Sequence, residues 1–348
     1  MSNLLPNPRN STMAVVIENK SNIELGVVPT HTKFVGGLAP DENGKLPRGE
    51  DGKLLMVSEM ANLKENSPAK IDSVQITLFP GTDTEDLDDM MNSFKELGLV
   101  VHLIMMVGGA DPMNPDDEEK VAEMLVSGLE TAKKYGVTNV SSTSLEEWMQ
   151  GEPKSGEAFD AAVAQLAKVH ARAHSDAGLA DSCVEAWHIE FLRGGEFQTF
   201  TSCAKAWQAV KAMNEAVGTN FFKVMVDAAH CGDSDLDIPQ NEAVIQEISD
   251  GGALGIFHAS AKTTRGCLST DDGWIGALMS AYARTGNMKH VFVEIFHHED
   301  PALEPLRNLD SGHGIDTSDG RSYSQMVVDG VVDVTRRLNN LVSRGILS

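Results

Sequence analysis

Short apolar runs alternate along the chain with longer segments whose apolar residues recur at helical spacing. Residues 99–107 (LVVHLIMMV) are typical of a buried strand, because a continuous apolar run suits a parallel sheet that is covered on both faces. Residues 83–98 instead place Leu87, Met91 and Phe94 on one side of a helix. The chain therefore reads as a repeated strand-then-helix pattern.

The same pattern predicts eight strands, at residues 23–29, 74–80, 99–107, 137–141, 182–190, 223–227, 254–258 and 289–295. It predicts helices at residues 83–98, 116–136, 156–174, 202–217, 241–250, 273–286 and 323–342. Alternation favours a parallel sheet, and eight units favour a closed (β/α)8 TIM barrel over an open doubly wound sheet. No Gly-x-Gly-x-x-Gly follows the first strand and no P-loop occurs, which argues against nucleotide binding.

The whole chain, residues 1–348, is expected to form this one barrel domain. Residues 1–20 are expected to be an N-terminal arm. Residues 33–72 and 298–321 are too long for tight connections and follow strand ends. Because barrels place their active sites at that end, both segments are predicted to be long loops and candidate lids.

The net charge of the chain limits the classes of partner that are expected. Lys plus Arg total 28 and Asp plus Glu total 51, a formal charge of −23 that repels phosphate backbones, so nucleic acid is not an expected partner. No apolar run approaches the roughly 18 residues of a membrane span, and the N-terminus lacks a signal-peptide pattern. The scattered cysteines indicate reduced thiols and a cytoplasmic location; they are Cys183, Cys203, Cys231 and Cys267.

Four consecutive predicted strands, the fifth to the eighth, end on carboxylate or imidazole side chains. They supply Glu190, Asp227 with His230 one turn later, His258, and Glu294. Strand ends of a barrel converge, and desolvated polar groups need a partner. Three carboxylates with an imidazole suit a divalent cation, so Glu190, Asp227, His258 and Glu294 are predicted metal ligands. We expect Mn²⁺ foremost, with Mg²⁺, Co²⁺ or Zn²⁺ as alternatives.

These strand ends resemble those of the xylose-isomerase-like barrels, in particular the D-tagatose/D-psicose 3-epimerase group. The resemblance covers about residues 180–300 by motif and the rest of the chain by topology. The matching stretches are HIEFLRGGE (188–196), VDAAHCG (226–232), FHASAKTTRG (257–266), DDGW (271–274) and VEIF (293–296).

The resemblance implies a role for each matching residue. Glu190 and Glu294 would bind the metal and act as the catalytic acid–base pair, while Asp227 and His258 complete the coordination. The resemblance also implies that the substrate is contacted by His230, Glu196 and Arg265. His31 is a further candidate contact, because it follows the first strand. A small-molecule sugar substrate and a homo-oligomer, a dimer or tetramer, are expected on the same ground.

Three departures from the family concern the substrate contacts. Gly194-Gly195 stands where the family has Asn-Arg, and Arg265 lies one residue further from His258 than is typical. The segment after the first strand is unusually long. Glu185 is the rival to Glu190, but the six-residue spacing from Glu190 to Glu196 matches the family.

The expected reaction is isomerisation or epimerisation of a ketose or keto-sugar through a cis-enediolate, with the two Glu as acid and base. The same groups would eliminate a leaving group at the β position, so a metal-dependent lyase, dehydratase or deglycosidase is the alternative. The charge argues against an endonuclease, and the four ligands argue against a non-enzymatic barrel. His170 and His174, four apart on a predicted helix, are expected at the surface.

Overall fold

The eight predicted strands form a closed parallel barrel in a computed structural model that describes residues 16–261, 273–297, 299–309 and 320–348. Each strand pairs with its neighbours in sequence, and β1 closes the barrel against β8. The (β/α)8 TIM-barrel prediction is therefore confirmed. The strands are β1 (Glu24–Val28), β2 (Ser73–Leu78), β3 (Val100–Met105), β4 (Asn139–Ser142), β5 (Ala186–Glu190), β6 (Phe222–Asp227), β7 (Leu254–Ala259) and β8 (His290–Glu294).

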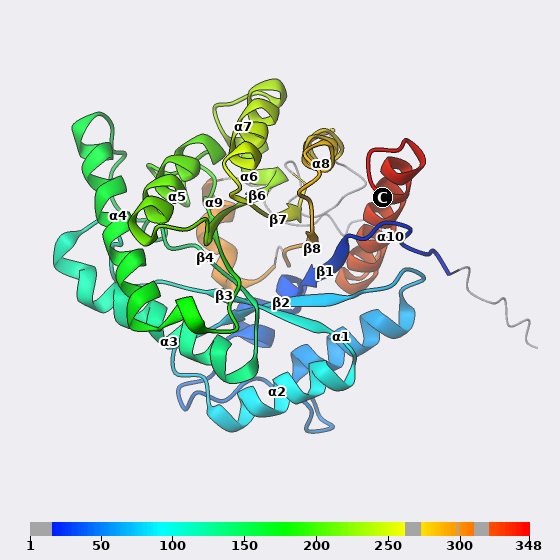
Figure 1. Cartoon of the computed structure of the whole chain (residues 1–348). Coiled ribbons are helices and arrows are strands. Elements are labelled where there is room, and N and C mark those ends of the chain that lie inside the picture. Colours follow the sequence, from blue (N-terminus) through cyan, green and yellow to red (C-terminus); the bar gives the residue numbers. More distant parts are fainter. Residues whose placement is uncertain (1–15, 262–272, 298, 310–319) are drawn as a thin grey trace, which may run out of the picture.

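Helices surround the barrel and cover its outer face (Figure 1). Their ends carry the expected signals: Asp83 accepts hydrogen bonds from the first turn of α2, and Gly136 ends α3 in the left-handed conformation. The outer helices are α1 (Leu55–Asn66), α2 (Thr84–Glu96), α3 (Glu118–Tyr135), α4 (Glu157–Asp176), α5 (Cys203–Val217), α7 (Ile238–Asp250), α8 (Trp274–Arg284) and α10 (Tyr323–Ser343).

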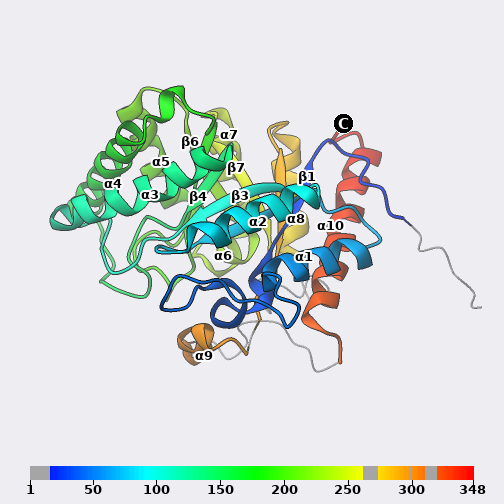
Figure 2. The same cartoon turned by 90° about the horizontal axis from the view of Figure 1, so that it is seen from below.

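Shorter elements follow several strand ends. They are η1 (Pro29–Thr32), η2 (Phe34–Leu38), η3 (Pro115–Asp117), α6 (Ala228–Asp233), η6 (Pro301–Leu303) and α9 (Glu304–Leu309), whereas η4 (Leu179–Asp181) lies between α4 and the start of β5. Figure 2 shows α9 and the segment that follows β1 at the same end of the molecule. That end is where the strands finish, so these elements lie where a barrel places its active site.

The two long segments are not loops throughout. Residues 33–72 contain α1, which packs Met56, Met60 and Leu63 into the core. Its helical pattern is short and follows a stretch rich in Gly, Pro and charge, which hid it in the sequence. Residues 298–321 contain η6 and α9.

The core lies mainly between the barrel and its helices, with a smaller cluster inside the barrel. The inner cluster consists of Val28, Ile104, Met225, Ile256 and Phe292. Side chains fill the interior of such a barrel, so it is a packed core and not a pore. Among the helices in the described ranges, none combines the length and apolar character that crossing a bilayer requires.

The closure of the barrel depends on β1. This strand pairs with β8 along its whole length, from Glu24 opposite His290 to Val28 opposite Glu294. It pairs with β2 over a shorter stretch, at Gly26 and Val27. A Cβ at Gly26 would overlap the ring of Phe292, so the close approach here requires glycine.

Candidate metal centre and adjoining cavity

The predicted ligands come together at the end of the barrel where the strands finish. Glu190, Asp227 and Glu294 are the last residues of β5, β6 and β8, and His258 is the penultimate residue of β7. All four side chains are buried. Parallel pairing of neighbouring strands brings them together, since Asp227 stands opposite His258 in the sheet.

Three carboxylates surround one nitrogen of His258. Oε1 of Glu190 and Oε2 of Glu294 each lie 3.6 Å from Nδ1 of His258, and Oδ2 of Asp227 lies 3.8 Å from it. These separations exceed hydrogen-bond length. They match ligands of one cation, because two atoms held about 2.1 Å from a metal at a near-tetrahedral angle lie about 3.5 Å apart.

The other nitrogen of His258 is fixed from across the barrel by a glutamine that the sequence reasoning missed. Nε2 of His258 lies 2.7 Å from Oε1 of Gln75, whose amide nitrogen donates to Oγ of Ser141 at 2.8 Å. Ser141 in turn donates to the carbonyl of Leu103. Oε1 of Gln75 therefore accepts a hydrogen bond from the protonated Nε2 of His258. A glutamine inside the mainly apolar strand VQITL was the available signal.

The hydrogen bonds of His258 are those expected of a metal-binding histidine. Because Nε2 is engaged by Gln75, Nδ1 is the ring nitrogen that His258 directs at the carboxylates, and Nδ1 has no hydrogen-bond partner in the described part of the chain. A metal-binding histidine normally donates its other N–H in this way, which fixes the tautomer and the ring orientation. The donor set of one imidazole and three carboxylates fits a divalent cation.

His230 lies beside the same carboxylates. Its Nδ1 is 3.6 Å from Oε1 of Glu190, and its backbone N–H donates to Oδ1 of Asp227 at 2.9 Å. Asp227 thus caps α6 with one oxygen while its other oxygen faces His258. Glu190, Asp227 and His230 offer ligand atoms within 4.8 Å of one another, as do Asp227, His258 and Glu294.

A cavity of about 320 Å³ adjoins the centre. Glu190, Glu196 and Glu294 border it, so the two predicted acid–base residues face one space. Most of its other lining is apolar, including side chains from η6 and α9. The lining residues besides the glutamates are Val28, Thr30, Thr77, Phe79, Ile104, Met106, Thr143, Trp148, Leu192, Phe296, Ala302, Leu303 and Leu306.

The segment that carries Glu196 is held by another residue that the sequence reasoning missed. Glu146 is buried and accepts hydrogen bonds from the backbone N–H groups of Gln198, Thr199 and Phe200. Burial raises the pKa of Glu146, while these hydrogen bonds oppose that rise. Nε1 of Trp148 lies 3.4 Å from Oε1 of Glu196. The loop after β5 is therefore anchored near the cavity.

His31 lies in η1, just after β1, next to Thr30 in the cavity wall. It is buried, and neither ring nitrogen has a hydrogen-bond partner within the described residues. Burial, with the nearby charge of His297, lowers the pKa of His31 to about 3, so the ring is neutral. A buried neutral imidazole with two open ring nitrogens can donate to or accept from a bound molecule.

Two sequence candidates lie elsewhere. Arg265 falls outside the described residues. Glu185, the rival to Glu190, is exposed and borders a different cavity, at the end of the barrel where the strands begin. Glu185 directly precedes β5, whereas Glu190, the last residue of that strand, is the carboxylate that lies beside His258 and His230.

No protein-family model matches the sequence, and no curated protein matches it. Solved structures do match. L-ribulose 3-epimerase is 16% identical with a TM-score of 0.64, covering 92% of this chain and 98% of its own. D-allulose 3-epimerase from Methylomonas sp., in complex with D-allulose, is 15% identical with a TM-score of 0.67, covering 92% and 99%.

An IOLI protein with a binding zinc atom also matches, with 15% identity and a TM-score of 0.58 over 91% of this chain and 99% of its own. At these identities the likeness concerns the fold. The chain has the fold of these two sugar 3-epimerase structures and of the IOLI protein.

Proposed function

We propose that this protein is a metal-dependent isomerase or epimerase that acts on a ketose or keto-sugar. The observation that carries the proposal is the position of His258, whose Nδ1 faces Glu190, Asp227 and Glu294 at 3.6–3.8 Å. Burying three carboxylates around one imidazole is costly unless a cation binds there.

The four residues Glu190, Asp227, His258 and Glu294 would hold the metal. When bound, a divalent cation polarises a carbonyl group and stabilises negative charge on its oxygen. Mn²⁺ is the first candidate, with Mg²⁺, Co²⁺ and Zn²⁺ as alternatives, because the donor set contains oxygen and nitrogen but no sulfur. The bound zinc of the IOLI structure supports a metal in this fold.

Glu190 and Glu294 would perform the proton transfers. They come from different strands, β5 and β8, and both border the 320 Å³ cavity. A sugar seated there would present the carbon next to its carbonyl to both carboxyl groups. One glutamate removes the proton, leaving a cis-enediolate, and the other returns a proton to the opposite face or to the neighbouring carbon. One carboxyl must be ionised and the other protonated.

The remaining predicted residues would position the sugar. Glu196 borders the cavity, and His230 and His31 lie at the same end of the barrel. Arg265 is proposed to bind hydroxyl groups on the basis of the sequence resemblance. The 3-epimerase activities in the names of the two neighbouring structures support a sugar as substrate.

A second candidate is a metal-dependent lyase, dehydratase or deglycosidase of a keto-sugar. The apolar lining contributed by Phe79, Trp148, Phe296 and α9 favours it. Such a wall would contact an apolar leaving group or substituent, while the same glutamates remove the proton that starts the elimination.

Two measurements on the purified protein test the proposal. Elemental analysis should find a divalent metal, and ketoses incubated with the enzyme in deuterated water should gain deuterium at the carbon next to the carbonyl, as read by NMR. Loss of water or of an aglycone would instead support the second candidate. A protein that binds no divalent cation, and exchanges no proton on any ketose or keto-sugar tested, would overturn both.

A further inference from the structure

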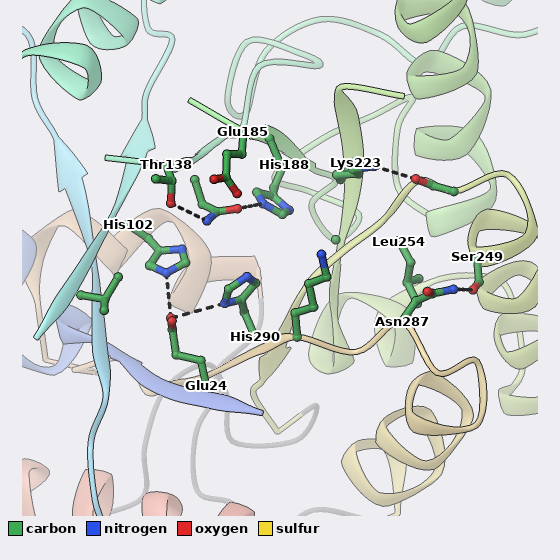
Figure 3. A pocket seen from close by; sticks show the side chains of 16 residues that line it. Glu24, His102, Thr138, Glu185, His188, Lys223, Ser249, Leu254, Asn287 and His290 are labelled. Carbon is green, nitrogen blue, oxygen red and sulfur yellow. Dashed lines mark hydrogen bonds and ion pairs between the residues drawn. The ribbon is translucent and has the colours of Figure 1, made fainter. Parts of the chain in front are cut away.

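A second cavity, of about 520 Å³, opens at the end of the barrel where the strands begin (Figure 3). Residues at or near the starts of β1, β3, β4, β5, β7 and β8 border it, so it lies opposite the candidate metal centre. Its lining is rich in ionisable side chains. They are Glu24, His102, Glu185, His188, Lys223, Lys289 and His290.

Three of these side chains converge on one point. Nε2 of His102 and Oε1 of Glu24 are 2.8 Å apart, a hydrogen bond that a bound cation would replace, and Nδ1 of His290 lies 3.4 Å from the same oxygen. Figure 3 shows both rings directed at the Glu24 carboxylate. The three residues come from β3, β1 and β8, and their potential ligand atoms lie within 4.8 Å of one another.

Within the described residues, the side-chain partners of the Glu24 carboxylate are these two imidazoles. No lysine or arginine pairs with Glu24 in the ranges that the structure describes. Nδ1 of His290 makes no hydrogen bond there either, although it faces the carboxylate. Two imidazoles and one carboxylate therefore present three donor atoms that one cation could bind.

The donor set also indicates which cation. Two imidazole nitrogens and one carboxylate oxygen are the protein ligands of many three-ligand zinc sites, in which the fourth position holds water. Imidazole suits Zn²⁺ and its neighbours in the first transition series better than Mg²⁺ or Ca²⁺. The cavity in front of the trio leaves room for that water and gives the ion a way in.

We propose that Glu24, His102 and His290 form a second divalent-cation site, of the zinc type, with one position open to this cavity. The site ties the starts of β1, β3 and β8 together at the floor of the barrel. It is independent of the proposed catalytic function, because it shares no residue with the centre around His258.

Zinc stoichiometry of the full-length protein tests the site. Metal-free protein is dialysed against Zn²⁺, and bound metal is counted by elemental analysis. Glu24→Gln and His290→Gln should each bind one equivalent less than the unmodified chain. Glu185→Gln, which alters a carboxylate in the same cavity outside the trio, should bind as much as the unmodified chain.

Asp227→Asn separates the two sites. If Asp227→Asn still binds one equivalent of zinc, and the double variant Asp227→Asn/Glu24→Gln does not, the second site is supported. This result does not depend on the outcome of the catalytic proposal. If Glu24→Gln and His290→Gln both bind as much zinc as the unmodified chain, the second site is overturned.

A measurement on the unmodified chain guards against misfolded variants. Diethyl pyrocarbonate carbethoxylates accessible imidazoles, and mass spectrometry locates the adducts. Saturating Zn²⁺ should protect His290 but leave His174 on α4, a half-buried histidine that packs against Phe221 and is not part of the trio, labelled as before. Equal labelling of His290 with and without Zn²⁺ would overturn the proposal.

Discussion

Gln75 on β2 fixes His258 on β7 from across the interior of the barrel, with 2.7 Å between Oε1 of Gln75 and Nε2 of His258. The orientation of the amide is set by Ser141, which accepts from the amide nitrogen and donates to Leu103. His258 therefore directs its Nδ1 at Glu190, Asp227 and Glu294. The proposed metal centre thus depends on Gln75, a residue that is not among its ligands.

Replacing Gln75 should weaken metal binding without removing a ligand. Gln75→Leu removes the acceptor that fixes the His258 tautomer, and loss of such a partner typically costs about 10–100-fold in metal affinity. Gln165→Leu, which alters a buried glutamine on α4 bonded to Glu118, is the control. Competition with a chelating dye measures both affinities. Unchanged affinity in Gln75→Leu would show that the glutamine does not orient the ligand.

Neutralising either proposed acid–base residue should remove proton transfer. Glu190→Gln and Glu294→Gln should each lower the rate of solvent deuterium incorporation into the ketose by about 10²–10⁴-fold, the usual contribution of a positioned acid or base. Glu185→Gln, altered at the exposed far end of β5, should keep the full rate. Metal content, measured alongside, separates lost chemistry from lost metal. Full exchange in both variants would contradict the assignment.

Removing the metal from the centre should destabilise the fold. A ligand that binds only the native state adds about 2.7 kcal/mol when present at 100 times its Kd. The Tm of the metal-loaded protein should therefore fall on dialysis against EDTA, as followed by circular dichroism. The fall in Tm on dialysis against EDTA should be much smaller for Asp227→Asn. Any fall that remains is attributed to a cation bound by Glu24, His102 and His290 at the other end of the barrel. An EDTA response as large in the double variant Asp227→Asn/Glu24→Gln as in the unmodified chain would contradict both sites.

Acid should destabilise the protein through His170. Nε1 of Trp187 donates to Ser142, the Ser142 hydroxyl lies 2.7 Å from that of Ser144, and Ser144 lies 2.7 Å from Nε2 of His170. Nδ1 of His170 lies 2.8 Å from the carbonyl of Leu166. The indole N–H of Trp187 can only donate, so Ser142 accepts from it and donates to Ser144. The Ser144 hydroxyl then donates to Nε2 of His170. This network requires a neutral imidazole.

Burial lowers the pKa of His170 from 6.5 to about 4, against the raising effect of its backbone hydrogen bond. Between these values the unfolded chain binds a proton that the folded chain does not, so stability is lost as the pH falls from 6.5 towards 4. The full effect is about 3 kcal/mol. Urea unfolding from pH 7 to pH 4 should show a shallower decline for His170→Gln than for His174→Gln, whose imidazole is only half-buried. Parallel declines in the two variants would exclude His170 as the group responsible.

The barrel could be predicted from the sequence because strands such as residues 99–107 are short apolar runs that alternate with helical patterns, and parallel strands are buried on both faces. Helix α1 was missed because its apolar positions, Met56, Met60 and Leu63, follow a long polar stretch. The surface position predicted for His170 is wrong, since the side chain is fully buried against Ser144 and Leu166. Helical spacing alone does not tell which face of a helix meets the barrel.

The convergence of Glu190, Asp227, His258 and Glu294 could be expected from their places at strand ends. The support of His258 could not, because Gln75 lies 183 residues away and no local pattern links the two. The same limit applies to Glu146, whose three backbone partners lie 52–54 residues further along the chain. Such pairings follow from closure of the barrel and not from sequence spacing.

That closure has a consequence during synthesis. β1 meets β8 along its whole length, so the earliest strand to leave the ribosome finds its main partner only after residue 294 has emerged. Until then the nascent sheet has two unpaired edges, which invite association with other chains. A ribosome-bound chain stalled just before β8 should therefore remain protease-sensitive and engage chaperones, whereas release of the complete chain lets the sheet seal.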